Sequence, residues 1–153
     1  MKIMGLDTST TATGYAILNG NKIVKSGVIK PNKTLSSIER IIYIEKEINT
    51  LYDKYKPDFI CIEEMVSFRN ANSMRVLIAL IYHLVIEYTK KEALVVLVRP
   101  TEWRKKAGIK GRVRSEYKEN AILHIKEKYN KIVSDDEADA ICIAEFGNTL
   151  EIE

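Results

Sequence analysis

The sequence predicts a single α/β domain with a mixed sheet, in which three antiparallel strands are followed by two parallel strands and helices cover the faces. Three observations favour this fold. Three short apolar runs separated by turn residues open the chain, and later apolar runs alternate with helical patterns. The length of 153 residues, with 46% hydrophobic and 29% charged residues, suits one compact core spanning residues 1–153.

The first three strands are expected to form an antiparallel meander. Residues 3–6 form a strand that ends at Asp7, and residues 14–18 form the second strand. Residues 19–21, Asn-Gly-Asn, are typical of a tight turn because Asn and Gly tolerate positive φ. Residues 22–29 return as the third strand.

The middle of the chain alternates helices and strands. A helix over residues 36–55 begins at a capping box of Ser36 and Glu39 and stops before Pro57. A continuous apolar run at residues 59–62 indicates a strand buried on both faces, which ends at Glu63. A helix over residues 71–90 and a strand over residues 94–98 follow.

The last third of the chain is predicted to be mainly helical. Residues 101–106 are expected to form one or two helical turns, and two glycines, Gly108 and Gly111, bracket a basic loop. A helix covers residues 115–129. Ser134 and Glu137 begin a final helix with a second Ser-x-x-Glu pattern, and Gly147 ends it.

Charge is unevenly distributed, although the net charge is only +3. Residues 99–118 hold eight basic and two acidic residues, whereas residues 134–153 hold seven acids and no Lys or Arg. A basic stretch beside an acidic cluster favours a nuclease, with one part holding phosphates and the other a metal. The alternative interpretation is two oppositely charged solvated faces.

Four acids stand out by position. Asp7 and Glu63 end two strands, and Asp136 and Asp139 lie three apart on one face of the last helix. If the two strands are neighbours, these carboxylates meet at one sheet edge, where a cation must offset their repulsion. Oxygen ligands select Mg²⁺ or Mn²⁺, and two such ions can activate the attacking water and stabilise the departing 3′ oxygen of a phosphodiester.

At this point the sequence resembles a known family, the RuvC-type Holliday-junction resolvases, over residues 2–147. The opening KIMGLDTSTTATGYAIL resembles the family's first strand, Gly-x-Asp and Thr-Gly-Tyr, and DFICIEE resembles its strand ending in Ile-Glu. RNANSMRVL resembles the start of its dimer-forming helix, and DDEADAICIA its closing Asp-x-x-Asp-Ala helix. PTEWRKKAGIKG looks most like the short phage-borne members.

The resemblance implies a ribonuclease-H-like fold and a homodimeric, Mg²⁺-dependent crossover junction endodeoxyribonuclease, with two ions per active site. It carries Asp7, Glu63, Asp136 and Asp139 over as catalytic metal ligands. The implied partner is four-way-junction or other branched DNA, with a branch-migration motor possible but not required.

The sequence also departs from the family pattern. Thr8-Ser9 stands where cellular members usually have Pro-Gly, and Glu64 and Asp135 are extra acids that allow a slip of one residue. The family's junction-wedging aromatic usually comes soon after the strand-ending Glu. Here Phe68 follows Glu63 by five residues, and Val66 lies nearer the expected place.

Several basic residues and one aromatic residue are predicted to contact DNA, the basic ones mainly through phosphates. They are Phe68, Arg69, Lys105, Lys106, Lys110, Arg112, Arg114 and Lys118. Trp103, the only Trp, can stack on a base, but a role in anchoring the basic loop is favoured.

The helix over residues 71–90 carries more apolar surface than one core face needs, since Leu80, Ile81 and Ile86 widen its stripe. This surplus predicts a subunit interface, and a two-fold dimer suits the two matched nicks that a junction requires. Leu80→Lys is expected to split that dimer.

Other features place the chain among intracellular proteins, with a cytoplasmic location in a bacterium or phage-infected cell. No apolar run is long enough to cross a bilayer, and the start of the chain does not look like a signal peptide. Cys61 and Cys142 are expected to be buried hydrophobes, and His83 and His124 structural or surface residues.

Three alternatives remain. The first is a flap or RNA–DNA hybrid nuclease of the same fold, and the second is a DNA-binding scaffold without catalysis, which the four retained acids disfavour. The third is an ATP-binding domain of the actin and sugar-kinase type, but those proteins need two such domains around the nucleotide, and 153 residues cannot supply them.

Overall fold

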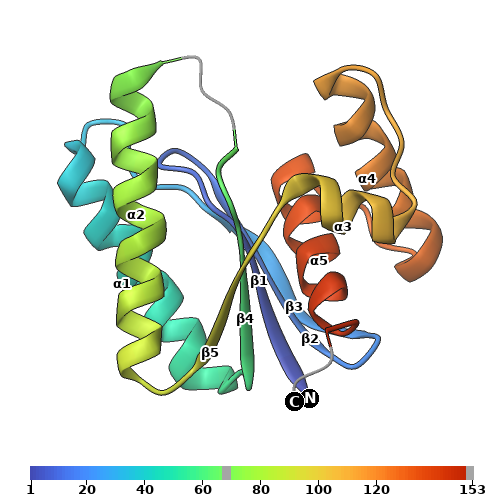
Figure 1. The fold of residues 1–153 in the computed structure, drawn as a ribbon, viewed down its shortest axis with the longest axis horizontal. Coiled ribbons are helices and arrows are strands. Elements are labelled where there is room, and N and C mark those ends of the chain that lie inside the picture. Colours follow the sequence, from blue (N-terminus) through green and yellow to red (C-terminus); the bar gives the residue numbers. More distant parts are fainter. Residues whose placement is uncertain (67–69, 151–153) are drawn as a thin grey trace.

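The computed structural model describes residues 1–66 and 70–150, and its core is a five-stranded mixed sheet with the order β3-β2-β1-β4-β5 (Figure 1). The strands are β1 (Lys2–Asp7), β2 (Thr13–Asn19), β3 (Lys22–Ile29), β4 (Phe59–Glu63) and β5 (Leu94–Val98). β1, β2 and β3 are antiparallel, while β4 is parallel to both β1 and β5. The predicted sheet is therefore confirmed.

Helices cover both faces of the sheet. α1 (Ser37–Tyr55) and α2 (Ala71–Lys90) lie on one face, and α3 (Pro100–Ala107), α4 (Arg114–Tyr129) and α5 (Asp135–Gly147) lie on the other (Figure 1). α3 is a two-turn helix that begins with Pro100, where one or two helical turns were expected over residues 101–106.

Alternate residues of the central strands face opposite layers, as the period of two requires. Met4, Leu6 and Ile60 pack against α1 and α2, while Ile3 and Cys61 belong to the core on the α5 side. Burial on both faces explains why β1 and β4 read as continuous apolar runs.

The helix starts follow the expected capping chemistry with one difference. Ser36 and Glu39 form the complete capping box of α1. At α5, Ser134 accepts a hydrogen bond from the Glu137 backbone, but the Glu137 carboxylate turns to Ser26 and Lys131 instead of closing the box. The helix also continues through Gly147, and Asn148 is its C-cap.

Leu80 was the wrong choice for an outward-facing residue of α2. It is fully buried in the core between α2 and the sheet. The large apolar side chains that α2 exposes are Tyr82 and Ile86, which are 54% and 53% exposed. The predicted dimer surface must therefore be tested at these two positions.

Within the described residues, no helix has the length and apolar character needed to span a bilayer. Cys61 and Cys142 are buried and unpaired, as expected. His83 is exposed and lies 3.0 Å from Glu45, while His124 contacts Glu145 at 2.8 Å.

Candidate active site

Two of the predicted acids emerge side by side from the centre of the sheet. Asp7 is the last residue of β1, and Glu63 is the last residue of β4. The strands run parallel with Leu6 opposite Ile62, so both acids leave the sheet at the same end. The expectation that the first and fourth strands are neighbours is confirmed.

Two glycines allow α5 to bring the other pair of acids to this place. A Cβ atom at Gly14, which pairs with Asp7 across the sheet, would lie 2.0 Å from the Asp136 carbonyl oxygen. One at Gly5 would lie 2.4 Å from the Ala140 carbonyl oxygen. The backbone of α5 therefore rests directly on β1 and β2, which places its first turns beside the end of β1.

The four predicted acids line one hollow of about 670 Å³. Among the described residues, no three of these carboxylates bring ligand atoms within 4.8 Å of one another, so they surround the hollow instead of meeting at a point. The residues that line it with them come from the ends of β1 and β4, from α3, and from the start of α4. The structure thus brings together Asp7, Glu63, Asp136 and Asp139.

Burial and mutual repulsion make these carboxyl groups reluctant to ionise. The pKa of Asp7 is raised well above its ordinary value by burial, then by Glu63, Asp139 and Asp136. Burial, with Glu63, raises the pKa of Asp139 to about 7. Burial also raises the pKa of Glu63 and of Asp136. Such a cluster is stabilised by any cation that enters it.

The extra acids at the two possible slips of register are each paired with a basic residue. Glu64 lies 3.3 Å from the Arg99 guanidinium, and Asp135 forms an ion pair with Lys118 that lowers its pKa. Within the described residues, no ion pair involves Glu63 or Asp136. Asp136 lines the hollow and Asp135 does not, whereas Glu63 and Glu64 both line it and differ in that only Glu64 is paired with a base.

Two neighbouring residues of α3 contribute to the site in ways that the sequence patterns did not predict. The Trp103 indole N–H donates to a Glu63 carboxylate oxygen at 2.7 Å, so this buried ring does more than anchor the loop. Arg104 lines the hollow and lowers the pKa of both Glu63 and Asp139. No sequence pattern links α3 to the end of β4, so neither contact could be predicted from the sequence.

The predicted DNA-binding residues divide into groups. Arg112, Arg114 and Lys118 line the acidic hollow itself, although Lys118 is paired with Asp135. Lys105 and Lys110 line an adjoining hollow, which shares Arg104 and Tyr117 with the first. Lys106 is exposed on α3 and lines neither hollow. Phe68 and Arg69 lie outside the described residues.

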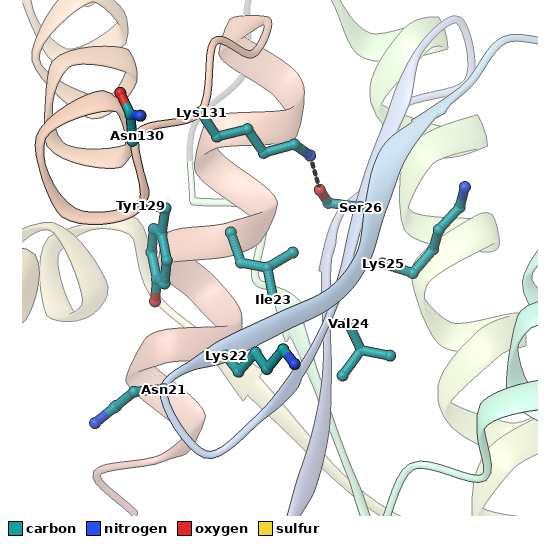
Figure 2. Close-up of a pocket in the computed structure, with 9 residues that line it drawn as sticks. All are labelled: Asn21, Lys22, Ile23, Val24, Lys25, Ser26, Tyr129, Asn130 and Lys131. Atoms are coloured by element: carbon teal, nitrogen blue, oxygen red, sulfur yellow. Dashed lines mark hydrogen bonds between the residues drawn. The ribbon is translucent and has the colours of Figure 1, made fainter.

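A separate groove runs along β3 and the segment after α4 (Figure 2). Lysines and asparagines dominate its lining, and Lys131 crosses to donate a hydrogen bond to Ser26. The groove shares no lining residue with the acidic hollow, and no carboxylate is among the residues that line it.

His124, Cys142 and Glu145 place potential metal-ligand atoms within 4.8 Å of one another. Glu145 already accepts a hydrogen bond from Tyr129 at 2.6 Å and forms an ion pair with Lys128 at 2.7 Å, and burial raises the pKa of the Cys142 thiol well above its ordinary value. These contacts indicate that the cluster has a structural role, in which polar contacts to Glu145 hold α4 against α5.

Comparison with known proteins identifies the family. Residues 3–145 match the family model for crossover junction endodeoxyribonuclease RuvC. The RuvC of Fusobacterium nucleatum is 30% identical over 151 residues, covering 94% of this chain and 77% of that protein. The RuvC of Prochlorococcus marinus subsp. pastoris is 27% identical over 148 residues, covering 94% of each chain.

Solved structures share the fold. A Thermus thermophilus RuvC in complex with a Holliday junction substrate superimposes with a TM-score of 0.80 at 16% identity, covering 95% of this chain and 91% of that one. A Fowlpox virus resolvase in complex with Holliday junction DNA gives 0.60 at 21% identity, covering 99% and 100%. Because residues 3–145 of its 153 residues match the family model, this chain belongs to the RuvC family of crossover junction endodeoxyribonucleases.

Proposed function

We propose that this chain is a structure-specific DNA endonuclease that resolves Holliday junctions by metal-dependent phosphodiester hydrolysis. The observation that carries the proposal is one hollow lined by the four predicted acids, by Glu64, and by the basic residues Arg104, Arg112, Arg114 and Lys118. The relatives named crossover junction endodeoxyribonucleases, and the resolvases solved with junction DNA, support the substrate class.

The residues of the hollow fit a divalent cation. Four carboxylates offer hard oxygen ligands, and burial is the main cause that raises their pKa values, with repulsion from neighbouring acids adding to it at Asp7 and Asp139. Asp7, Glu63, Asp136 and Asp139 would hold two Mg²⁺ ions, with Mn²⁺ as a substitute. Bound there, the ions would activate the attacking water and neutralise charge on the leaving 3′ oxygen.

The chain's own residues would bind and orient the substrate. Arg112 and Arg114 stand exposed at the start of α4 beside the acids, where they can hold the phosphates that flank the cleaved bond. Lys105 and Lys110 extend this basic surface into the adjoining hollow. These basic residues would attract the phosphates of the DNA backbone, and the four acids would bind the metal ions.

A two-fold substrate calls for two equivalent sites. We therefore extend the proposal to a homodimer formed through α2, in which each protomer nicks one strand. It would act on junctions in the cytoplasm without an obligatory branch-migration motor.

Incubation with synthetic four-way junction, flap, RNA–DNA hybrid and linear duplex, each with Mg²⁺ and with EDTA, tests the proposal. Paired, symmetric nicks in the junction alone, dependent on Mg²⁺, are expected. Preferential cutting of flaps or hybrids would indicate another nuclease of the same fold, and tight junction binding without cleavage in any metal would indicate a non-catalytic scaffold.

A further inference from the structure

Glu63 is held by residues 98–103, which span the end of β5 and the first turn of α3. The backbone N–H of Glu64 donates to the Val98 carbonyl oxygen at 2.8 Å, which fixes the peptide that follows Glu63. The Trp103 indole N–H then donates to one Glu63 carboxylate oxygen at 2.7 Å. Both the main chain and the side chain of this acid are therefore tied to the same neighbouring segment.

The donor itself is rigidly placed. Trp103 is 1% exposed and belongs to the core on the α5 side of the sheet. The helix that carries it begins at Pro100, and the Glu102 carboxylate accepts a hydrogen bond from the Arg99 backbone N–H at 2.9 Å. The indole N–H therefore keeps its direction without help from a ligand.

The face of the Trp103 ring contacts the guanidinium of Arg104, which also lines the hollow. The Arg104 guanidinium lies 4.9 Å from the Trp103 ring centre and 4.7 Å from the Tyr117 ring centre, so it is held between two aromatic rings. Its Nε atom is buried without a hydrogen-bond partner among the described residues. One indole thus contacts both an acid and a base that line the hollow.

A neutral donor is chemically suited to this position. An indole N–H can only donate, and it carries no charge. It can fix one oxygen of Glu63 while leaving the carboxylate negative and the second oxygen free. Glu64 provides the contrast, since its carboxylate lies beside the positively charged Arg99.

We propose that Trp103 is a positioning residue, which orients Glu63 toward the hollow with an uncharged hydrogen bond so that the carboxylate remains available to a divalent cation. The inference rests on the proposed metal-dependent function. Loss of a group that supports a metal ligand commonly weakens metal binding by about 10- to 100-fold. We expect a loss of about 10-fold here.

The test removes the donor and keeps the ring. Trp103 is replaced by β-(3-benzothienyl)alanine, in which sulfur takes the place of the N–H, and the 5-fluorotryptophan protein, which retains the N–H, is the matched control. Mn²⁺ binding is measured by electron paramagnetic resonance, together with thermal unfolding in EDTA. The sulfur analogue should bind Mn²⁺ about 10-fold more weakly, and the fluorinated control should match wild type.

Junction binding in EDTA and cleavage give independent readouts. The sulfur analogue should bind the junction as wild type does and should regain most of its cleavage rate when Mg²⁺ is raised about 10-fold. Trp103→Phe is a second variant without the donor, and it should show the same pattern if it folds.

The outcomes separate the two proposals. If wild type binds Mn²⁺ and the folded sulfur analogue binds it equally well, Trp103 does not position Glu63 and this inference fails, while the proposed function stands. If wild type binds no Mn²⁺ in this site, so that Asp139→Asn changes nothing, the proposed metal-dependent function itself fails.

Because the chain contains a single Trp, one indole N–H resonance reports on this contact. Glu63→Gln should shift that resonance, and added Mn²⁺ should broaden it in wild type. If the resonance neither shifts in Glu63→Gln nor broadens with Mn²⁺, the inference is also overturned.

Discussion

Gly14 and Asp136 are in direct backbone contact, with no room for a side chain between β2 and the start of α5. Gly14→Ala would force α5 away from the sheet and carry Asp136 and Asp139 from the other two acids. We expect a loss of about 3 kcal/mol in the free energy of unfolding and loss of cleavage. Denaturant unfolding and a junction cleavage assay measure the two effects.

Gly20→Ala is the control, because Gly20 has a φ of +56° but nothing near its missing side chain. Strain alone should cost about 1 kcal/mol and leave cleavage intact. Equal loss of activity in both variants would mean that the contact with α5 is not what matters at Gly14.

A second prediction concerns pH. The pKa of Asp139 in the folded protein is about 7, above its ordinary value of 3.8. The protonated carboxyl therefore contributes to the stability of the folded state. This contribution is full below about pH 4 and is lost as the pH rises through 7. In EDTA, Asp139→Asn should therefore be more stable than wild type at pH 8 by about 2 kcal/mol, and the difference should shrink at pH 5. Thermal unfolding at both pH values measures it.

Asp53→Asn serves as the comparison for this experiment. Asp53 is exposed and forms only a surface ion pair with Lys56, so its replacement should change stability by less than about 0.5 kcal/mol at either pH. If Asp139→Asn destabilises the metal-free protein at pH 8, the hollow does not penalise negative charge as described.

The register of the site is tested by a pair of substitutions. Glu63→Gln should reduce cleavage by more than about 100-fold. Loss of a group that only supports a metal ligand costs up to about 100-fold, and loss of a ligand itself should cost more. Junction binding should persist, since the basic residues remain. Glu64→Gln should be mild because its carboxylate faces Arg99. The reverse ranking in a single-turnover assay would shift the site by one residue.

The basic surface is tested by salt dependence. Changing Lys105, Lys106, Lys110 and Arg112 together to Ala should weaken binding to all DNA forms. The slope of log affinity against log salt should fall by about 0.9 for each phosphate that the variant no longer neutralises. Lys22→Ala with Lys25→Ala, in the groove along β3, should leave the slope unchanged. An unaltered slope in the quadruple variant would place these side chains away from DNA.

The dimer is tested on the outer face of α2. Tyr82→Lys with Ile86→Lys should yield monomers by sedimentation and reduce paired nicking while isolated nicks persist. Ile42→Lys is the matched control, because Ile42 is 57% exposed on α1, a helix for which no interface is predicted. A wild type that is monomeric at micromolar concentration and still nicks in pairs would contradict the dimer.

Local patterns carried most of the fold. The Asn-Gly-Asn turn between β2 and β3, the Ser36 capping box and the apolar run before Glu63 are signals that neighbouring residues supply, and the structure confirms the elements they predict. The neighbouring ends of β1 and β4 followed from topology, because parallel strands present their carboxyl ends at one edge.

Contacts between distant segments were beyond those patterns. Leu80 and Ile86 occupy one apolar stripe in the sequence, but only the packed helix shows that Leu80 faces the sheet and Ile86 faces outward. The bond from Trp103 to Glu63 joins residues 40 positions apart, and the Glu137 carboxylate leaves its expected cap for Ser26. Side-chain choices between competing partners are decided by tertiary packing.

The placement of α5 has a consequence for how the protein is made. Translation produces Asp7 first, but Asp136 and Asp139 follow only after every strand of the sheet has been synthesised. A nascent chain on the ribosome consequently lacks two of the four predicted site acids until the last helix emerges and packs against Gly5 and Gly14. The four predicted acids therefore surround one hollow only after α5 has packed against the sheet.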